Sequence, residues 1–405
     1  MTDVLLVHQN FPGQFPHIAD ALVRRGDRVA AIGGPSAKGR PGVDLRRWNN
    51  RRGTTQGILP AAIRAEADLI RAEAAAGAAL QLKRDGFTPR VIAGHSGWGE
   101  TIHLREVWPE ARLIVLGEMF YRARGTDSDF DPEFGGRDFA ETMRVVAKGA
   151  AQSLAYAQAD RIICPTPFQA ASFPPGLRAT IRVLHEGLDL DRARRRAGAR
   201  VSLPGGRVLD GSRPVVTFVS RTLEPLRGFH VFMRALPRFL AECPEAEVLV
   251  IGRPALAGYG LKSPDGVSWK SWALAELGGR IDPARVHFAD EVDHATLIDA
   301  FSISWAHVYY TYPFVLSWSL VEAMACECLV LASDTAPVRD AVTDGHDGVL
   351  LPFFDPDALA AALARAVREP AAFAPLRAEA RRTALARFDR AAGVAGWLAE
   401  IDGVA

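Results

Sequence analysis

The sequence has few cysteines, and their spacing does not indicate that any two of them form a disulfide or a metal site. Its 405 residues contain only Cys164, Cys243, Cys326 and Cys328, without the C-x-x-C spacing of a zinc site or redox pair. No disulfide framework of a secreted protein is indicated, so a cytoplasmic location is expected. Because Cys326 and Cys328 are two residues apart on an expected helix, they point in different directions and are interpreted as small packing residues.

Long apolar runs and an excess of one charge are also missing. No segment reaches the roughly 18 apolar residues of a membrane-spanning helix, and the first residues lack the basic flank of a signal peptide. The formal net charge of +1 gives no general attraction for nucleic acid, and no nucleic-acid-binding module is recognisable. The chain has ordinary globular composition, with 48% hydrophobic and 23% charged residues, and its length indicates two or more domains.

What is present is an alternation of short apolar strands and amphipathic helices, and this alternation occurs twice. Strands are expected near residues 4–7, 28–33, 91–93, 113–116, 161–164 and 181–184, and again near 215–219, 247–251, 286–288, 306–310 and 329–332. The pattern indicates an α/β fold with parallel sheets covered by helices on both faces. The expected organisation is an N-terminal domain at 1–195, a charged linker at 196–212, a second domain at 213–385 and a terminal helix at 386–405. The packing partner of this helix is either domain, and the N-terminal domain is one of the two alternatives.

The loops that follow strands are where ligands bind in open α/β sheets. The loop at 8–14 places Gly13 just before a helix, where the backbone can approach a phosphate closely, although the loop is not a G-x-G-x-x-G sequence. The loop at 94–100 contains three glycines and His95. His95 is interpreted either as a buried structural histidine or as a substrate contact.

Two arginines flank the turn that follows the first strand of the second half. Arg221 and Arg227 lie in one loop at 220–228, and planar guanidinium groups bind phosphate oxygens in pairs without losing their charge. These residues are candidates to clamp a diphosphate. The alternative is that both are solvated surface arginines.

Residues 311–340 read as a glycine-free loop, a helix beginning near Trp318 or Ser319, and a buried strand. Ser317 and Ser319 are candidate caps, which leaves backbone N–H groups and the positive end of the helix dipole for a phosphate. Glu322 is expected in the first turn, within reach of a ribose. The alternative is a capped helix whose glutamate only favours its own dipole.

Taken together, these segments resemble glycosyltransferase family 4. The matching stretches are HQNFPGQFPHIADALVRRGDRVAAIGG from residue 8, VLHEGLDLD (183–191), FVSRTLEPLRGFHVFMRAL (218–236), VHFADEV (286–292), LVEAMACECLVLASD (320–334) and the TAPVRDAVTDGHDGVLL that follows. The resemblance implies the GT-B fold, in which two Rossmann-like domains face each other across a cleft. It also implies metal-independent transfer of a sugar from a nucleotide diphosphate sugar, with retention of configuration and no other cofactor.

The resemblance also implies roles for individual residues. Arg221 and Arg227 would stabilise the diphosphate leaving group, and Glu322 would accept hydrogen bonds from the ribose. Gly13 would lie near the distal phosphate, and His95 would meet the transferred sugar. The acceptor, a sugar, a lipid-linked sugar or a polysaccharide, would bind the first domain, and bacterial surface polysaccharide or glycolipid synthesis is the expected setting.

One departure from the family pattern concerns the donor site. The family carries two glutamates in a Glu-x7-Glu pattern, but the position eight residues before Glu322 is Phe314, and no acidic residue occurs in 311–321. The chain offers Tyr312, Phe314, Ser317 and Trp318 there instead. Either other groups replace the carboxylate, or the donor sugar differs, or the protein binds nucleotide sugar with little turnover. The last reading would make it a non-catalytic partner subunit, and a GT-B sugar-nucleotide epimerase is a further alternative.

Two charged segments need a separate interpretation. Asp127, Asp129 and Asp131 resemble a metal-binding D-x-D sequence, but they do not follow an expected strand and lack the glycine of a calcium loop, so no metal site is expected. The basic run from Arg46 to Arg52 is interpreted as a site for an anionic acceptor, a peripheral contact with the inner face of the membrane, or a solvated loop.

Overall fold

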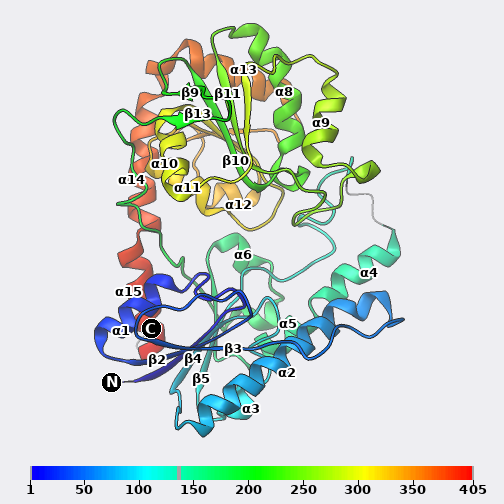
Figure 1. Ribbon diagram of the computed structural model, residues 1–405, viewed down its shortest axis with the longest axis vertical. Coiled ribbons are helices and arrows are strands. Elements are labelled where there is room, and N and C mark those ends of the chain that lie inside the picture. The colour runs from blue at the N-terminus through cyan, green and yellow to red at the C-terminus, as the bar shows by residue number, and fades with distance from the viewer. Residues whose placement is uncertain (1, 135–137, 404–405) are drawn as a thin grey trace. The chain divides into compact units, whose positions relative to one another are not determined.

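The chain divides into two compact units (Figure 1). The computed structural model describes residues 2–134 and 138–403. Unit 1 comprises Met1–Asp129, Gly135–Gly187 and Arg390–Ala405, and unit 2 comprises Phe130–Phe134 and Leu188–Asp389. In the described part of the chain, none of the helices combines the length and the apolar character needed to cross a membrane.

Unit 1 is built on a seven-stranded parallel sheet in the order β3-β2-β1-β4-β5-β6-β7. The strands are β1 (Asp3–Val7), β2 (Arg28–Gly33), β3 (Val43–Arg47), β4 (Val91–His95), β5 (Arg112–Leu116), β6 (Arg161–Cys164) and β7 (Ile181–Val183). Alternate residues of β1 enter different cores, Leu5 and Val7 on one face and Val4 and Leu6 on the other. Both faces are therefore covered, which is why the strands read as continuous apolar runs.

The strand order of unit 1 reverses direction at β1, and this reversal positions its polar residues. β1 pairs with β2 on one side and with β4 on the other, with Val7 opposite Gly94. The loops after β1 and β4 therefore leave the sheet next to each other at its carboxyl edge. Such switch points are where open α/β sheets bind ligands.

The helices of unit 1 cover the two faces of this sheet. They are α1 (Pro16–Arg25), η1 (Pro60–Ala62), α2 (Ile63–Arg84), α3 (Leu104–Val107), α4 (Phe139–Lys148), α5 (Ala150–Gln158), α6 (Pro167–Ala171), α7 (Pro175–Arg178) and α15 (Arg390–Asp402). The terminal helix α15 lies beside α1 in Figure 1, and Trp397 packs edge-on against Phe15 with ring centroids 5.5 Å apart. Buried Glu400 of α15 pairs with three arginines of the sheet, Arg112, Arg161 and Arg182.

Unit 2 repeats the design with a six-stranded parallel sheet in the order β12-β11-β10-β13-β14-β15. Its strands are β10 (Val215–Thr222), β11 (Glu247–Arg253), β12 (Val286–Ala289), β13 (Ser304–Tyr309), β14 (Val330–Ser333) and β15 (Val349–Leu351). The order reverses at β10, which lies between β11 and β13. The arginine loop after β10 and the loop after β13 therefore emerge side by side.

The remaining elements of unit 2 are helices and a short hairpin. The helices are η2 (Pro225–Arg227), α8 (Phe229–Glu242), η3 (Pro264–Gly266), α9 (Trp269–Leu277), α10 (His294–Ile303), α11 (Trp318–Ala325), α12 (Ala336–Arg339), α13 (Pro356–Arg368), η4 (Pro370–Phe373) and α14 (Ala374–Phe388). Cys326 and Cys328 are fully buried in the core around α11, which confirms their packing role. The hairpin of β8 (Val201–Ser202) and β9 (Val208–Leu209) lies in the segment expected to be a linker. Its apolar residues pack against β11 and so cover that side of the sheet.

A short segment from the first half of the sequence belongs to unit 2. In this inserted segment, Phe130–Phe134, two aromatic rings contact the aromatic residues Tyr312, Phe353, Phe354, His230, Trp269 and Trp272. Between the rings, buried Asp131 accepts a hydrogen bond from the hydroxyl of Tyr312. Aromatic packing and one buried carboxylate thus hold the segment in place.

Candidate functional site

A cluster of two histidines and a glutamate occupies the carboxyl edge of the unit 1 sheet. His8 follows β1, His95 ends β4, and Glu118 follows β5, so three neighbouring strands supply the cluster. Both histidines are buried, and their ring centroids are 5.2 Å apart. Trp98 stacks on His95 with centroids 4.3 Å apart. The structure therefore places His95 in a packed polar cluster at the position where substrate contacts were expected.

Backbone hydrogen bonds fix which ring nitrogens carry protons. The N–H of Asn10 donates to His8 Nδ1 at 2.9 Å, and the N–H of Gly97 donates to His95 Nδ1 at 2.9 Å. In the neutral rings the proton is therefore on Nε2. His8 Nε2 lies 2.7 Å from Gln14 Oε1, and the Gln14 amide in turn donates to Glu118 Oε1 at 2.7 Å.

The second oxygen of Glu118 faces His95, with 3.3 Å between Oε2 and Nε2. Burial, reinforced by the neighbouring His95, lowers the pKa of His8 to about 3, so His8 is neutral at physiological pH. Burial opposes ionisation of Glu118, but His95, His8 and the Gln14 amide outweigh it and lower the pKa of this carboxyl. The cluster thus presents an ionised carboxylate, whose side chain is 36% exposed, beside a tautomerically fixed imidazole.

Sequence reasoning missed Glu118, although its position after a buried strand was an available signal. Gly13, which was singled out, has a φ of +50°, and a Cβ there would lie 2.2 Å from His8 Nε2. Its N–H donates to Asn10 O at 3.1 Å within the loop. The structure therefore explains the glycine by the close approach of the His8 ring, and the role expected at a phosphate remains a prediction.

In unit 2, a cavity of about 310 Å³ lies between the end of β10 and the start of α11. Its polar lining is Ser220, Arg221, Arg253, Asp290, Glu291, Ser317 and Ser319, and its apolar lining is Val219, Ile251, Val292 and Leu297. Three of the predicted donor residues thus line one cavity: Arg221, Ser317 and Ser319. Arg253, Asp290 and Glu291 were not predicted, although they also lie at the ends of strands or in the loop after β12.

The helix at this cavity begins as the sequence predicts. Ser317 is the N-cap of α11, and its hydroxyl accepts from the N–H of Ser319 at 3.4 Å. Its own N–H donates to the Tyr309 hydroxyl at 2.8 Å. Trp318, 40% exposed, is the first helical residue. The cavity therefore faces the positive end of a capped helix.

The expectation that Glu322 lies in the first turn is wrong. Because Ser317 is the cap, Glu322 is the fifth helical residue and lies in the second turn. Its carboxylate is 2.7 Å from His294 Nε2, and this hydrogen bond raises the pKa of His294. Glu322 does not contribute to the lining of the 310 Å³ cavity.

The two predicted arginines have different environments. Arg221 is exposed and donates to the Tyr259 hydroxyl at 2.9 Å. Arg227 is only 8% exposed and donates through one nitrogen to Thr311 Oγ1 and Val315 O, both at 3.0 Å. The interpretation of Arg227 as a surface arginine is therefore wrong, because the loop after β13 encloses its side chain.

Phe314, at the position of the expected carboxylate, packs between the two arginine environments. The Arg227 guanidinium carbon lies 5.5 Å from the Phe314 ring centroid, and the Tyr259 ring centroid also lies 5.5 Å from the Phe314 centroid. Arg221 lies over the Tyr259 ring at 5.8 Å. The two arginines and the two rings therefore form a continuous series in the order Arg227, Phe314, Tyr259 and Arg221. Arg227 forms no ion pair with any residue that the structure describes.

Buried Glu224 fixes the loop that carries Tyr259. Its carboxylate accepts from the N–H groups of Tyr259 at 3.1 Å and Gly260 at 2.8 Å, and burial raises its pKa. A Cβ at Gly258 would lie 2.3 Å from Glu224. Sequence reasoning missed Glu224 even though it lies within the arginine loop, because its partners are more than thirty residues away.

Comparison with known proteins decides the family. The "Glycosyl transferase family 4 group" matches residues 25–193, and "Glycosyl transferases group 1" matches residues 213–369. The chain belongs to glycosyltransferase family 4. This confirms the resemblance seen in the sequence.

Curated proteins with similar sequences include D-inositol 3-phosphate glycosyltransferases of several bacteria. D-inositol 3-phosphate glycosyltransferase of Rhodococcus jostii (strain RHA1) is 32% identical over 252 residues, covering 60% of this chain and 53% of the relative. The enzyme of the same name from Streptomyces avermitilis is 32% identical over 314 residues, covering 74% of this chain and 61% of the relative. The matched segments therefore span between about half and three fifths of the length of these relatives.

Solved structures confirm the GT-B fold. Sucrose-phosphate synthase from Thermosynechococcus elongatus superposes with a TM-score of 0.76 at 19% identity, covering 100% of this chain and 99% of the other. Anabaena HepE, solved in complex with UDP and glucose, superposes with a TM-score of 0.69 at 16% identity over the full length of both chains. At these identities the likeness shows the fold alone.

One group of residues in this family 4 protein has the composition of a metal site. Asp131, Glu133 and His230 place ligand atoms within 4.8 Å of one another. However, Glu133 pairs with Arg234 through two hydrogen bonds of 2.7 and 2.6 Å, and Asp131 pairs with His230 at 3.3 Å. Because a guanidinium already neutralises Glu133, the cluster is better described as an ion-pair network that anchors the inserted segment.

Proposed function

We propose that this protein transfers a sugar from a nucleotide diphosphate sugar to an acceptor, with retention of configuration at the anomeric carbon. The observation that carries the proposal is the 310 Å³ cavity at the start of α11, which Arg221, Ser317 and Ser319 line. An arginine and the positive end of a helix offer charge to the same space, and a departing diphosphate is the group that needs it.

In this proposal, arginine side chains rather than a metal ion stabilise the leaving group. Departure of the nucleoside diphosphate develops negative charge on the leaving oxygen. Arg221 would contact that charge directly, and buried Arg227, which keeps its full charge, would add to the potential at the end of β10. Glu322, in the second turn of α11, is proposed to accept hydrogen bonds from the ribose hydroxyls in place of its hydrogen bond with His294.

Unit 1 is proposed to bind the acceptor. The partly exposed, ionised carboxylate of Glu118 is suited to accept a hydrogen bond from a sugar hydroxyl, and His95 Nε2–H is suited to donate one. The acceptor is proposed to be a sugar, a polyol phosphate, a lipid-linked sugar or a polysaccharide. We place the protein in the cytoplasm, with peripheral contact at the inner face of the membrane through residues 46–52, in synthesis of bacterial surface polysaccharide or glycolipid.

The test is release of nucleoside diphosphate from a panel of nucleotide sugars by the purified protein, with and without acceptors and with and without a chelator. Arg221→Ala should lower kcat/KM by roughly 10²- to 10³-fold, as expected for the loss of one group that stabilises developing charge. Arg365→Ala, a 61% exposed arginine on α13, is the matched control. A donor turned over equally well by Arg221→Ala would refute the assigned role, and loss of turnover with the chelator would refute metal independence.

Phe314 in place of a carboxylate favours one second candidate, a nucleotide-sugar-binding subunit without turnover. Calorimetric binding of a nucleotide sugar, combined with no product from any donor and acceptor pair, would support this candidate. Product formed from the donor without an added acceptor, with the sugar configuration inverted, would instead identify an epimerase.

A further inference from the structure

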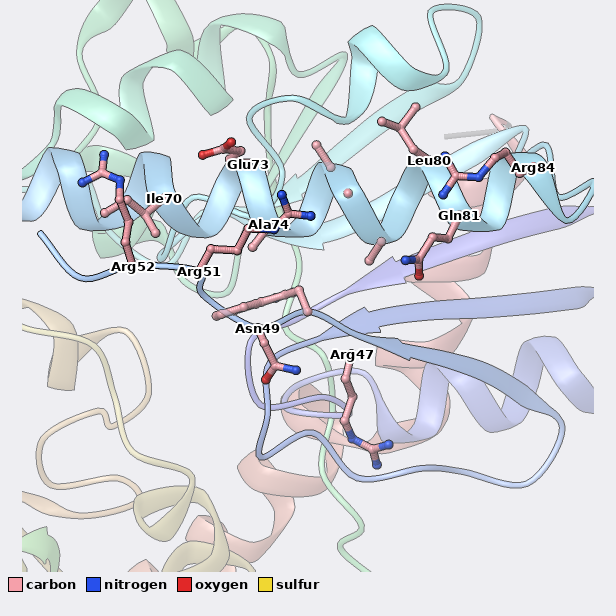
Figure 2. A pocket seen from close by; sticks show the side chains of 14 residues that line it. Arg47, Asn49, Arg51, Arg52, Ile70, Glu73, Ala74, Leu80, Gln81 and Arg84 are labelled. Carbon is pink, nitrogen blue, oxygen red and sulfur yellow. The ribbon is translucent and has the colours of Figure 1, made fainter.

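A second and larger cavity lies in unit 1, between the chain after β3 and the exposed side of α2 (Figure 2). Its volume is about 710 Å³, within the range of roughly 300–1,000 Å³ typical of small-molecule sites. Of the residues given a role above, only those of the basic run from Arg46 to Arg52 line it. We call this cavity the arginine groove.

The lining of the arginine groove carries an excess of positive charge. Arg47, Arg51, Arg52 and Arg84 contribute guanidinium groups, and Glu73 contributes the single carboxylate. Without compensating groups, this excess attracts anions from solution.

Two of the four arginines are already engaged. Arg52 donates to Glu66 at 2.9 Å, which cancels much of its charge. Arg47 donates to Ala37 O at 3.0 Å, and its head points away from α2 in Figure 2. These two are therefore poor candidates to hold a ligand.

The other two arginines have no such partner. Within the described ranges, Arg51 and Arg84 make no hydrogen bond or ion pair. In Figure 2, Arg51 extends from the loop toward α2 near Ala74, and Arg84 stands toward the far end of the helix beside Gln81. Residues 74 and 84 are separated by about 15 Å along a helix axis, so the two free cations lie at different points along the groove.

The floor of the groove is made of small residues. Ala74, Gly77 and Ala78 are spaced three and four apart on α2 and so lie on one face. A Cβ at Gly77 would meet no atom within 4 Å, so this position opens into free space. The amides of Asn49 and Gln81 line the walls and can both donate to and accept from hydroxyl groups.

We propose that the arginine groove binds a phosphorylated sugar or polyol. A guanidinium group binds phosphate oxygens in pairs, so the phosphate would lie on Arg51 or Arg84. The ring would lie over the small-residue floor at Gly77, with its hydroxyls on Asn49 and Gln81. Binding of this ligand does not depend on the proposed glycosyl transfer. Its role as an acceptor, or as part of one, rests on that proposed function.

The same phosphate chemistry can come from a free sugar phosphate or from a lipid headgroup, and the experiment separates them. Calorimetry would compare glucose 6-phosphate, inorganic phosphate and glucose, without any donor present. Co-sedimentation would compare vesicles of phosphatidylcholine with vesicles that also contain phosphatidylinositol. The variants are Arg51→Gln, Arg84→Gln and Gly77→Phe, with Arg365→Gln as the matched control because it removes one exposed charge elsewhere.

The wild-type protein should bind glucose 6-phosphate more tightly than either phosphate or glucose. At least one arginine variant should weaken this binding roughly tenfold, Gly77→Phe should abolish it with an unchanged circular dichroism spectrum, and the control should retain it. Binding only to phosphatidylinositol vesicles, with the same pattern among variants, supports the site with a lipid headgroup as its ligand. Equal binding by all variants, or no binding of any phosphate-bearing probe, overturns the proposal. Because no donor is present, either result leaves the test of sugar transfer unaffected.

Discussion

Replacement of Glu100 by glutamine should stabilise unit 1 at neutral and alkaline pH. Glu100 is 1% exposed, and neither of its carboxylate oxygens has a hydrogen-bond partner in the described part of the chain. Burial raises its pKa from 4.5 to about 7, although its own backbone amide, Arg71 and His95 oppose the shift. The folded protein therefore prefers the protonated, neutral side chain.

The direction of the effect follows from proton binding. The unfolded chain loses the Glu100 proton near pH 4.5, whereas the folded chain keeps it until about pH 7. Between these values the folded state binds more protons, so the free energy of unfolding falls as pH rises and levels off above pH 7. At 1.36 kcal/mol per pH unit, this interval corresponds to about 3 kcal/mol. Glu100→Gln, which cannot ionise, should lack this loss.

The assay is urea unfolding of both proteins from pH 4.5 to 8, followed by circular dichroism. The two should have similar free energies of unfolding at pH 4.5, and Glu100→Gln should be about 3 kcal/mol more stable at pH 8. Glu66→Gln is a control with the opposite effect. Hydrogen bonds from Thr55 and Arg52 lower the pKa of Glu66 to about 2, so its ionised carboxylate stabilises the folded state above pH 4.5. Glu66→Gln should therefore be less stable than the wild type by an amount that changes little between pH 4.5 and 8. A difference between wild type and Glu100→Gln that does not change with pH would refute the reasoning.

Three further substitutions test the sites. Glu118→Gln should lower kcat by roughly 100-fold, because it removes the negative charge beside His95. Nucleotide affinity should stay unchanged, and an unchanged kcat would contradict this role of Glu118. Phe314→Glu should pair with Arg227 and weaken nucleoside diphosphate binding roughly tenfold by calorimetry, whereas Phe314→Leu should not. Asp131→Asn should destabilise unit 2 by about 3 kcal/mol, because it leaves His230 without its buried carboxylate; hydrogen exchange that is unchanged in unit 2 peptides would count against this.

The sequence predicted every central strand of the two parallel sheets because those strands are buried on both faces. Such strands are continuous apolar runs, and their alternation with helices determines a parallel sheet. β3 (Val43–Arg47) and β15 (Val349–Leu351) were missed for the opposite reason. Each lies at the edge of its sheet and is incompletely buried, so β3 keeps charged side chains and neither strand forms an apolar run of the expected length.

Parts of the site that depend on local chemistry could also be predicted. Ser317 caps α11 through a contact two residues away, and the arginine loop was located by its place after β10. Other roles depend on contacts between segments distant in the sequence. Glu118 is oriented by Gln14, 104 positions away, and Arg227 is enclosed by a loop more than eighty residues later. No local pattern specifies such partners.

The aromatic residue at position 314 determines how much charge the unit 2 site retains. A carboxylate there would lie against Arg227 and neutralise it, whereas the Phe314 ring attracts the guanidinium without removing its charge. Within the described residues, the hydrogen-bond partners of Arg227 are the neutral oxygens of Tyr309, Thr311 and Val315. A buried cation with neutral partners is costly to the folded state until an anion approaches it. Binding of a nucleoside diphosphate should therefore stabilise unit 2 more strongly in the wild type than in Phe314→Glu, and the change in thermal unfolding temperature with added nucleotide measures that difference.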